Sequence, residues 1–179
     1  MTTSGISCAS LCAGLGLGTA TATSTTPATL VAGSRTILSP TVTLPADNDL
    51  AKGKSVTVSS FSQPNTPNLA VDGDLSTRWA QGLGLPDPSW IQVDLGAVTS
   101  IKSAVTTFEL PSGYEYLLEY SADGVNWSTF QDHTAGRTTD RTNYAFLPQP
   151  VDARYVRLTV TNSNWNGGSI YELQVYGGF

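Results

Sequence analysis

Two short runs in the second half of the chain alternate apolar and polar residues one position at a time. In the run 90–95 the apolar side chains are Ile91, Val93 and Leu95, and the run 156–160 repeats the pattern. Successive side chains of a β-strand point to opposite faces of its sheet, so each run has one dry face and one wet face. Short runs of this kind, separated by turn residues, are typical of a β-sandwich or barrel.

Eight runs after residue 48 have this β-rich character, and nothing in this part of the chain has the period of a long helix. The dipeptide Asp123-Gly124 lies between two of the runs, where a tight hairpin turn favours residues that accept a positive φ. The predicted strands are 55–60, 90–95, 101–108, 114–121, 127–131, 144–147, 154–161 and 170–176.

The first 47 residues have a different composition. They consist mostly of Thr, Ser, Ala and Gly, and they lack helical or sustained alternating periodicity. We expect a low-complexity linker or tail over 1–47 and one folded domain over 48–179, with 28–32 and 41–44 as stretches able to pair as edge strands. Cys8 and Cys12 both lie in the first segment, so no disulfide is expected within the domain.

The charge balance disfavours some classes of partner. The formal net charge is -5, and the sequence contains no basic cluster. Partners bound through neutralised phosphates, such as nucleic acid or an anionic membrane surface, are therefore not expected. Thr, Ser, Gly, Trp and Tyr are abundant and Lys is scarce, a balance typical of an all-β extracellular domain. A secreted or cell-surface location is the expectation, and the absence of basic residues before the weakly apolar stretch 6–22 favours a fragment of a longer secreted protein over a cleaved signal peptide.

Four segments occur in an order and spacing that resemble a known superfamily. They are NDLAKGK at 48–54, AVDGDLSTRW at 70–79, WIQVDLG at 90–96, and ARYVRL at 153–158 followed by IYELQVYG at 170–177. Together they are similar to the discoidin-like (coagulation factor C-domain) superfamily, and most closely to its family 32 carbohydrate-binding modules. The resemblance covers the chain after residue 47 and implies an eight-stranded jelly-roll β-sandwich. It is less specific for function, because this fold serves several classes of ligand.

The segment 72–77 brings oxygen ligands into one turn. Asp72, Asp74 and Thr77 lie close together in sequence, and Gly73 permits the sharp bend that lets them converge. Such hard donors suit Ca²⁺, whereas the competing interpretation is an Asx-turn whose carboxylates accept backbone N–H groups. The family's calcium site, which is structural rather than catalytic, implies as ligands the carbonyls of Leu69 and Tyr171 and the side chains of Asp72, Asp74, Thr77 and Glu172.

We expect a ligand at one end of the sandwich, formed by the loops 61–68, 80–89, 108–114 and 162–168. Trp165 lies in a polar, glycine-rich loop, where its indole is either a platform for a sugar ring or a lid over the core. Glu109 either contacts sugar hydroxyls or the ammonium of glucosamine, or is a solvated loop residue. The expected carbohydrate-binding residues are Gln63, Arg78, Glu109 and Trp165, with a structural salt bridge to a loop carboxylate as the rival role of Arg78.

Three departures from the family pattern weaken particular sugar specificities. Galactose-binding members carry a histidine directly after the tryptophan that corresponds to Trp79, and this chain has Ala80 there. They also carry an arginine near the end of the strand 101–108, where this chain has Phe108-Glu109. Modules that bind amino sugars carry an aromatic residue at the position that corresponds to Leu83.

Three further tryptophans lie in or beside predicted strands and are assigned to the core. They are Trp79, Trp90 and Trp127.

Catalysis finds little support in the sequence. Hydrolysis of a glycoside usually needs two carboxyl groups across a cleft, and Glu109 is the one carboxylate assigned to the binding loops. The single histidine, His133, has no cysteine nearby and no serine in a nucleophile elbow, and it is expected in an exposed loop. The domain is therefore expected not to be an enzyme.

Three hypotheses about function follow. The leading one is a monomeric, non-catalytic module of a multidomain protein that attaches a carbohydrate-active enzyme or surface protein to a polysaccharide or glycan. The second is a discoidin-type adhesion or lipid-binding domain, with Leu83, Leu85 and Leu110 as apolar spikes beside Arg78 and Lys54. The third is a structural spacer without a ligand.

Overall fold

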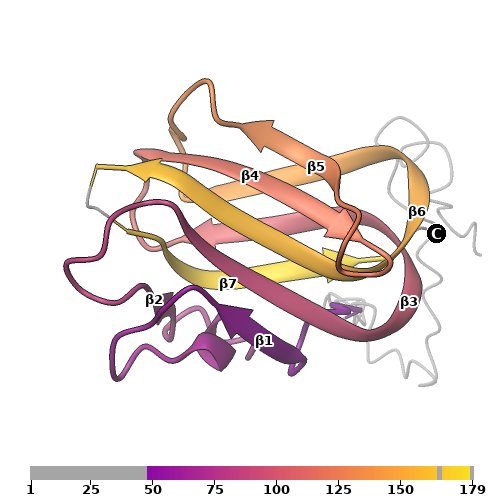
Figure 1. The fold of residues 1–179 in the computed structure, drawn as a ribbon, viewed down its shortest axis with the longest axis horizontal. Coiled ribbons are helices and arrows are strands. Elements are labelled where there is room, and N and C mark those ends of the chain that lie inside the picture. The colour runs from indigo at the N-terminus through magenta and orange to yellow at the C-terminus, as the bar shows by residue number, and fades with distance from the viewer. Residues whose placement is uncertain (1–47, 165–166, 178–179) are drawn as a thin grey trace, which may run out of the picture. The chain divides into compact units, whose positions relative to one another are not determined.

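The computed structural model describes residues 48–164 and 167–177 of the chain. Within these ranges the protein is an antiparallel β-sandwich whose one helical element is the 3-10 helix η1 (Pro67–Ala70). The strands are β1 (Ser55–Val58), β2 (Trp79–Ala80), β3 (Ser89–Phe108), β4 (Tyr114–Ser121), β5 (Ser128–His133), β6 (Thr142–Ser163) and β7 (Ser169–Tyr176). Figure 1 shows these strands with their labels.

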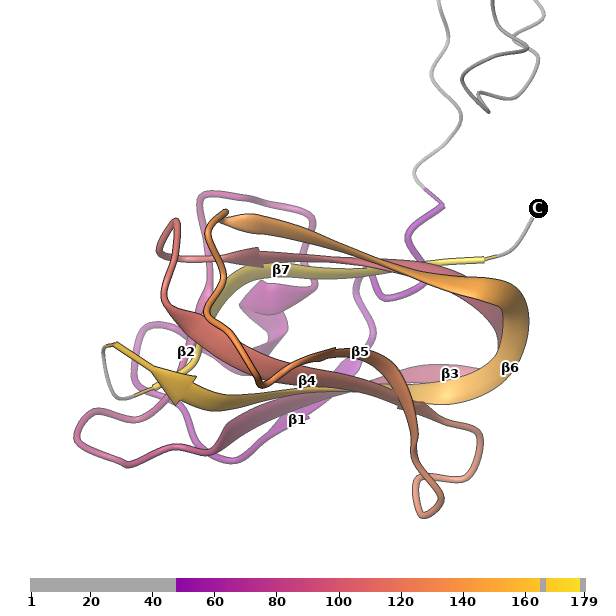
Figure 2. The same ribbon diagram turned by 90° about the horizontal axis from the view of Figure 1, so that it is seen from above.

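Two long strands, β3 and β6, connect the two layers. Both bend round at the same end of the sandwich, at the right of Figure 2. They pair with each other along both arms, 89–94 with 155–160 and 103–107 with 142–146. One layer therefore contains β1, the first arm of β3, the second arm of β6, β4 and β5, and the other contains β2, β7 and the remaining arms.

The predicted all-β jelly-roll sandwich is confirmed. The predicted strands 90–95 and 101–108 are the two arms of β3, and 144–147 and 154–161 are the two arms of β6. The pairing of β3 changes register after Asp94, where Gly96 has a φ of 91° and donates its N–H to the Asp94 carboxylate over 2.8 Å. A left-handed glycine at this point lets the strand turn from one layer into the other without an intervening loop.

The core lies between the layers, and the alternating pattern predicts most of it. Ile91, Val93 and Leu95 of β3 are buried, as are the apolar residues of the second arm of β6. Burial of such side chains is the main favourable term in folding. Trp79 is completely buried, as predicted.

The assignment of Trp90 and Trp127 to the core was wrong. Both are partly exposed, and both rings face the Arg157 guanidinium, whose carbon lies 3.8 Å from the Trp127 ring centroid and 5.6 Å from that of Trp90. Trp90 points outward because its neighbour Ile91 points inward. The two indoles form cation–π contacts on the surface of the sheet instead of filling the core.

The bends in β3 and β6 decide where the connecting loops lie. Because each long strand turns back, its two ends emerge at the same end of the sandwich (Figure 1). The loop before β3, the loop after β3 and the turn before β7 therefore lie close together. The first described residues lie beside the end of β7, where Leu50 N–H donates to the Val175 carbonyl over 2.7 Å.

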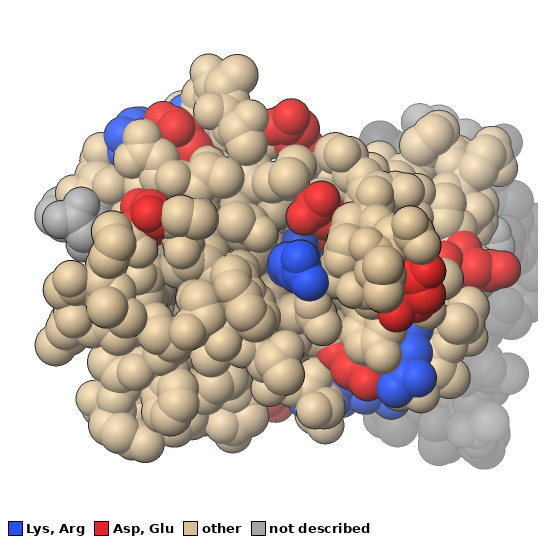
Figure 3. All heavy atoms as spheres, in the orientation of Figure 1, with Lys and Arg blue, Asp and Glu red and all other residues tan. Residues whose placement is uncertain are grey.

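Opposite charges lie next to one another on the face seen in Figure 1. In the same orientation, Figure 3 shows that most of this face is uncharged and that its basic groups lie beside acidic ones. Arg154 and Asp94 are an example of such pairing in the structure, joined by two hydrogen bonds of 2.8 Å. The described helical segment is too short to cross a membrane.

Candidate functional site

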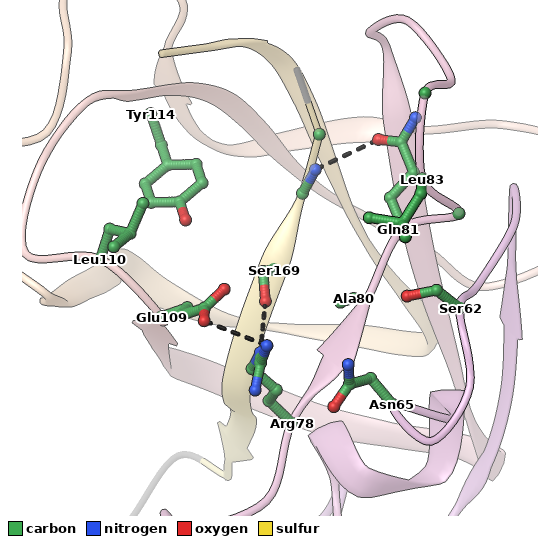
Figure 4. A pocket seen from close by; sticks show the side chains of 14 residues that line it. Ser62, Asn65, Arg78, Ala80, Gln81, Leu83, Glu109, Leu110, Tyr114 and Ser169 are labelled. Atoms are coloured by element: carbon green, nitrogen blue, oxygen red, sulfur yellow. Dashed lines mark hydrogen bonds and ion pairs between the residues drawn. The ribbon is translucent and has the colours of Figure 1, made fainter. Parts of the chain in front are cut away.

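A pocket of about 310 Å³ opens at the end where the loops gather. It is formed by the loop before η1, by β2 with the loop that follows, by the β3–β4 loop, and by the start of β7 (Figure 4). Its lining residues are Ser62, Asn65, Arg78, Ala80, Gln81, Gly82, Leu83, Gly84, Glu109, Leu110, Tyr114, Gly167, Gly168 and Ser169. A small cavity with several polar groups and a partly apolar rim has the general character of a small-ligand site.

An ion pair lies in this pocket. Arg78 Nη2 is 3.1 Å from Glu109 Oε1, and each side chain is 32% exposed. Arg78 Nε also donates to the Ser169 hydroxyl over 3.1 Å, and that hydroxyl in turn donates to the carbonyl of Trp79 over 3.2 Å. Figure 4 shows the guanidinium between Glu109 and Ser169. The structure thus brings together two residues predicted separately from the sequence, and the salt bridge that was the rival role of Arg78 is present.

Gln81 holds one wall of the pocket in place. Its side-chain N–H₂ donates to the carbonyls of Leu85 and Pro86, both over 3.1 Å, and its carbonyl accepts the N–H of Gly168 over 3.2 Å. Gln81 is buried, so these bonds have no water to replace them. They fix the loop 82–86 against the chain that leads into β7, which gives the pocket a preformed wall.

Tyr114 links the pocket to the core. It lines the pocket, yet it is buried, and its ring stacks on Phe108 with centroids 4.3 Å apart. Burial raises the pKa of the Tyr114 hydroxyl to about 12, so the group is a neutral donor at ordinary pH.

The rim of the pocket carries an exposed apolar residue. Leu83 is 92% exposed, and it occupies the position where an aromatic residue is expected in modules for amino sugars. Leu85 nearby is also exposed. Leu110, the third residue considered as an apolar spike, packs against the core instead. The rim thus offers an aliphatic contact rather than a flat aromatic one.

The remaining predicted site residues have different positions. Gln63 is exposed and does not line the pocket, whereas Ser62 and Asn65 on either side of it do. Trp165 lies outside the described residues. His133, expected in an exposed loop, is instead the last residue of β5, where its ring stacks on Tyr116 and Nδ1 lies 2.6 Å from the Gly136 carbonyl.

A second cluster of oxygen atoms lies in the turn 72–77. Asp72 Oδ1 accepts the N–H of Asp74 over 2.9 Å, and Asp72 Oδ2 accepts the Thr77 hydroxyl over 2.7 Å. The Asp74 carboxylate accepts the N–H and hydroxyl of Ser76, and these bonds hold the pKa of Asp74 below its usual range. This is the Asx-turn arrangement of the competing interpretation.

Glu172 lies beside this turn and has an incompletely satisfied carboxylate. It is 1% exposed, and its Oε1 accepts the Gly73 N–H over 2.6 Å, while Oε2 has no hydrogen-bond partner among the described residues. Burial raises the pKa of Glu172 to about 7, and the nearby Asp72 adds to the rise. A buried carboxylate oxygen without a partner fits a cation.

The acidic side chains alone do not form a metal cage. Within residues 48–164 and 167–177, no three His, Cys, Asp or Glu side chains lie together in an arrangement that holds a metal. A calcium site there needs the carbonyls of Leu69 and Tyr171 and the Thr77 hydroxyl to complete it, as the resemblance implied. The donor set, composed of oxygens only, fits Ca²⁺ in its chemistry.

The sheet order, the loop-end pocket and the acidic turn define a discoidin-type module, and sequence comparison agrees. The model of the F5/8 type C domain family matches residues 55–173, and the chain belongs to this family. The omicarin-C non-catalytic subunit of the venom prothrombin activator of Oxyuranus microlepidotus is 38% identical over 87 residues, which are 40% of this chain. The match spans only 6% of that subunit.

Solved structures with the same fold include family 32 carbohydrate-binding modules. Chitosan-binding module 1 of a chitosanase/glucanase from Paenibacillus sp. IK-5 is 32% identical, with a TM-score of 0.64 over 72% of this chain and 98% of that module. Module 2 of the same enzyme, solved with chitotriose, is 28% identical, with a TM-score of 0.62 over 72% of this chain and 100% of that module.

A third structure supports the fold alone. The Clostridium perfringens module CpGH89CBM32-4, in complex with glcNAc-alpha-1,4-galactose, is 20% identical, with a TM-score of 0.61 over 70% of this chain and 91% of that chain. The domain described here is thus a non-catalytic module of the F5/8 type C class.

Proposed function

We propose that this module binds a carbohydrate in the loop-end pocket and attaches a larger secreted or cell-surface protein to a polysaccharide or glycan. The observation that carries the proposal is the fixed polar pair Arg78–Glu109 in a pocket of about 310 Å³ with an aliphatic rim. A sugar-binding site needs polar groups that form hydrogen bonds with the sugar hydroxyls, and apolar surface that contacts the C–H faces of the ring. The similarity to modules from carbohydrate-active enzymes supports it further.

The module is proposed to act as a tether without chemistry of its own. The pocket contains one carboxylate, Glu109, and this group is paired with Arg78. An acid and a nucleophile or base facing each other across a bound glycoside, as hydrolysis requires, are not available from one carboxylate. Binding through one small pocket is weak, so attachment of a host protein gains from several modules or several copies of the ligand.

We propose that Ca²⁺ binds at the turn 72–77 and serves stability. Leu69 and Tyr171 contribute carbonyls, and Asp72, Asp74, Thr77 and Glu172 contribute side chains. The bound ion supplies positive charge to a buried carboxylate. Because Glu172 belongs to β7 and the turn precedes β2, these residues tie the last strand to an early loop.

Binding of the module to a glycan array tests the carbohydrate proposal. The wild-type module is expected to bind a defined set of saccharides, and Ser62→Trp, which fills the pocket from its side, is expected to abolish that binding. Binding to anionic lipid vesicles with no saccharide binding would instead support a lipid-binding domain with Leu83 and Leu85 as spikes. An absence of binding in both assays would favour a structural spacer.

A further inference from the structure

The charges in the pocket cancel each other. Of the 14 residues that line it, Arg78 and Glu109 are the charged ones, and they form a salt bridge with each other. Gln63, the other polar residue predicted for ligand contact in the described chain, is also uncharged. A ligand that enters the pocket therefore meets a local net charge of zero. Electrostatic attraction gives neither a cationic nor an anionic sugar an advantage there.

The same pair presents a donor beside an acceptor in a fixed arrangement. Ser169 holds Arg78 Nε, and Glu109 holds Nη2, so the guanidinium cannot rotate freely. These two contacts leave Arg78 Nη1 and Glu109 Oε2 uninvolved. A sugar hydroxyl both donates and accepts, and two hydroxyls on neighbouring ring carbons match such a donor and acceptor. Hydrogen bonds to charged groups are stronger than neutral ones, even when the charges of the pair cancel.

From this geometry we infer that the pocket selects an uncharged sugar through two neighbouring hydroxyl groups, and disfavours the ammonium of an amino sugar and the carboxylate of a uronic acid. The inference rests on the proposed carbohydrate function and narrows its ligand class. An ammonium placed against Glu109 lies within a few ångströms of the Arg78 guanidinium. Like charges at that distance repel, so the attraction of an ammonium to Glu109 is offset by its repulsion from Arg78. The same reasoning applies to a uronate carboxylate placed against Arg78.

Calorimetric titration with hexamers of β-1,4-linked glucose, β-1,4-linked glucosamine and galacturonic acid tests the inference. The glucose and glucosamine hexamers differ in one substituent per ring, so their comparison measures the effect of replacing one hydroxyl by an ammonium. Wild type is expected to bind the glucose hexamer about tenfold more tightly than either charged hexamer. Its affinity for the glucose hexamer is expected to be the same in about 20 mM salt as in about 500 mM salt, because salt does not screen the binding of an uncharged ligand.

Two single substitutions turn the neutral pocket into a charged one. Arg78→Gln leaves Glu109 unpaired, and we expect it to bind the glucosamine hexamer about tenfold more tightly than wild type does, with an affinity that falls in high salt. Glu109→Gln leaves Arg78 unpaired, and the corresponding gain is expected for the galacturonic acid hexamer. Both variants are expected to lose about tenfold in affinity for the glucose hexamer.

Glu115→Gln is the matched control. It removes the charge of another salt-bridged glutamate, which pairs with Arg137 over 3.4 Å and does not line the pocket. Its affinities for the three hexamers are expected to equal those of wild type. The unfolding midpoint of each variant, measured in urea, shows whether its fold is intact.

The outcomes separate this inference from the proposed function. If wild type prefers the glucosamine or galacturonic acid hexamer in a salt-sensitive way, or if Arg78→Gln gains no affinity for the glucosamine hexamer, the neutral-sugar inference is wrong and the carbohydrate function stands. If wild type binds none of the three hexamers and no glycan on the array, both the inference and the proposed function are overturned.

Discussion

Two glutamates on neighbouring strands of the same layer have opposite surroundings. Glu172 of β7 is buried, and one of its carboxylate oxygens lacks a hydrogen-bond partner among the described residues. Glu109, directly after β3, is a third exposed and forms an ion pair with Arg78. The backbones are close, since Glu172 is paired with Thr107 and the Glu109 N–H donates to the Ser169 carbonyl.

The different surroundings of the two glutamates suit them to different roles, Glu172 to fold stability and Glu109 to ligand binding. A buried carboxylate that is incompletely satisfied costs folding free energy until a cation or a proton neutralises it. A partly exposed ion pair contributes little to folding, because water screens it and two long side chains lose freedom. It does, however, keep polar groups in place for a ligand. The region of Glu172 is therefore suited to a structural ion, and the region of Glu109 to a ligand.

The largest expected effect is that of calcium removal. Chelation with EGTA is expected to lower the Tm by about 5–10 °C and added calcium to restore it, because a ligand at 100 times its Kd stabilises the folded state by about 2.7 kcal/mol. Differential scanning fluorimetry measures the shift. Asp72→Ala is expected to behave like the chelated protein. An unchanged Tm in saturating EGTA, with no metal in elemental analysis, would falsify the calcium proposal.

Glu172→Gln sharpens this prediction. The amide keeps the shape of the side chain and removes the buried charge. In EGTA the variant is expected to be at least as stable as wild type, and its Tm is expected not to respond to calcium. A Tm that still rises with calcium in this variant would place the ion elsewhere.

The next effect comes from the pocket wall. Gln81→Ala is expected to destabilise the domain by about 2–3 kcal/mol, because it leaves the Leu85 and Pro86 carbonyls without their partner and leaves the Gly168 N–H with the Ser89 hydroxyl alone. Urea unfolding measures this value. Gln63→Ala, the same change at an exposed position, is expected to stay within about 0.5 kcal/mol of wild type. Equal stabilities of the two variants would show that Gln81 does not hold the loop 82–86.

The sequence predicts the fold well because most strands have one buried face. The alternation around Ile91 and Val156 is visible without any structure, and it places the core residues of β3 and β6 correctly. It does not reveal that two pairs of predicted strands are continuous, since a bend at Gly96 leaves the same local pattern as a loop. The two-residue strand β2 is too short for any periodic signal. Trp90 was misplaced although the alternation that buries Ile91 already directs it outward.

The site is less predictable, because its residues meet only through the fold. Arg78 and Glu109 were each selected through resemblance, yet their pairing depends on how the segment before β2 and the loop after β3 approach each other. Gln81 and Ser169 were missed, since a polar residue next to a short strand carries no signal of its partners. Tyr114 was assigned both to a strand and to the end of the loop 108–114 expected at the ligand site, and it lies at the start of β4 and lines the pocket.

A smaller effect is expected at alkaline pH. Burial raises the pKa values of Tyr114 and Tyr116 to about 12, from about 10 in the unfolded chain. Their contribution to stability is fully present below pH 10 and is lost as the pH rises toward 12, because the unfolded state releases these protons first. Urea unfolding at pH values of about 9, 10, 11 and 12 measures the decline in the free energy of unfolding. Tyr116→Phe is expected to reduce its slope, and an unchanged slope would assign the decline to other groups.

The smallest expected effect is the stability change on breaking the ion pair of the pocket. Glu109→Gln and Arg78→Gln are each expected to change the free energy of unfolding by no more than about 0.5 kcal/mol, because both side chains are a third exposed and water replaces the lost partner. The Ser169 hydroxyl keeps Arg78 in place when Glu109 is changed. Urea unfolding of the two variants beside wild type measures the differences. A loss of about 2 kcal/mol or more in the free energy of unfolding would mean that the pair supports the fold as Glu172 does. The division between a structural and a ligand-binding carboxylate would then not hold.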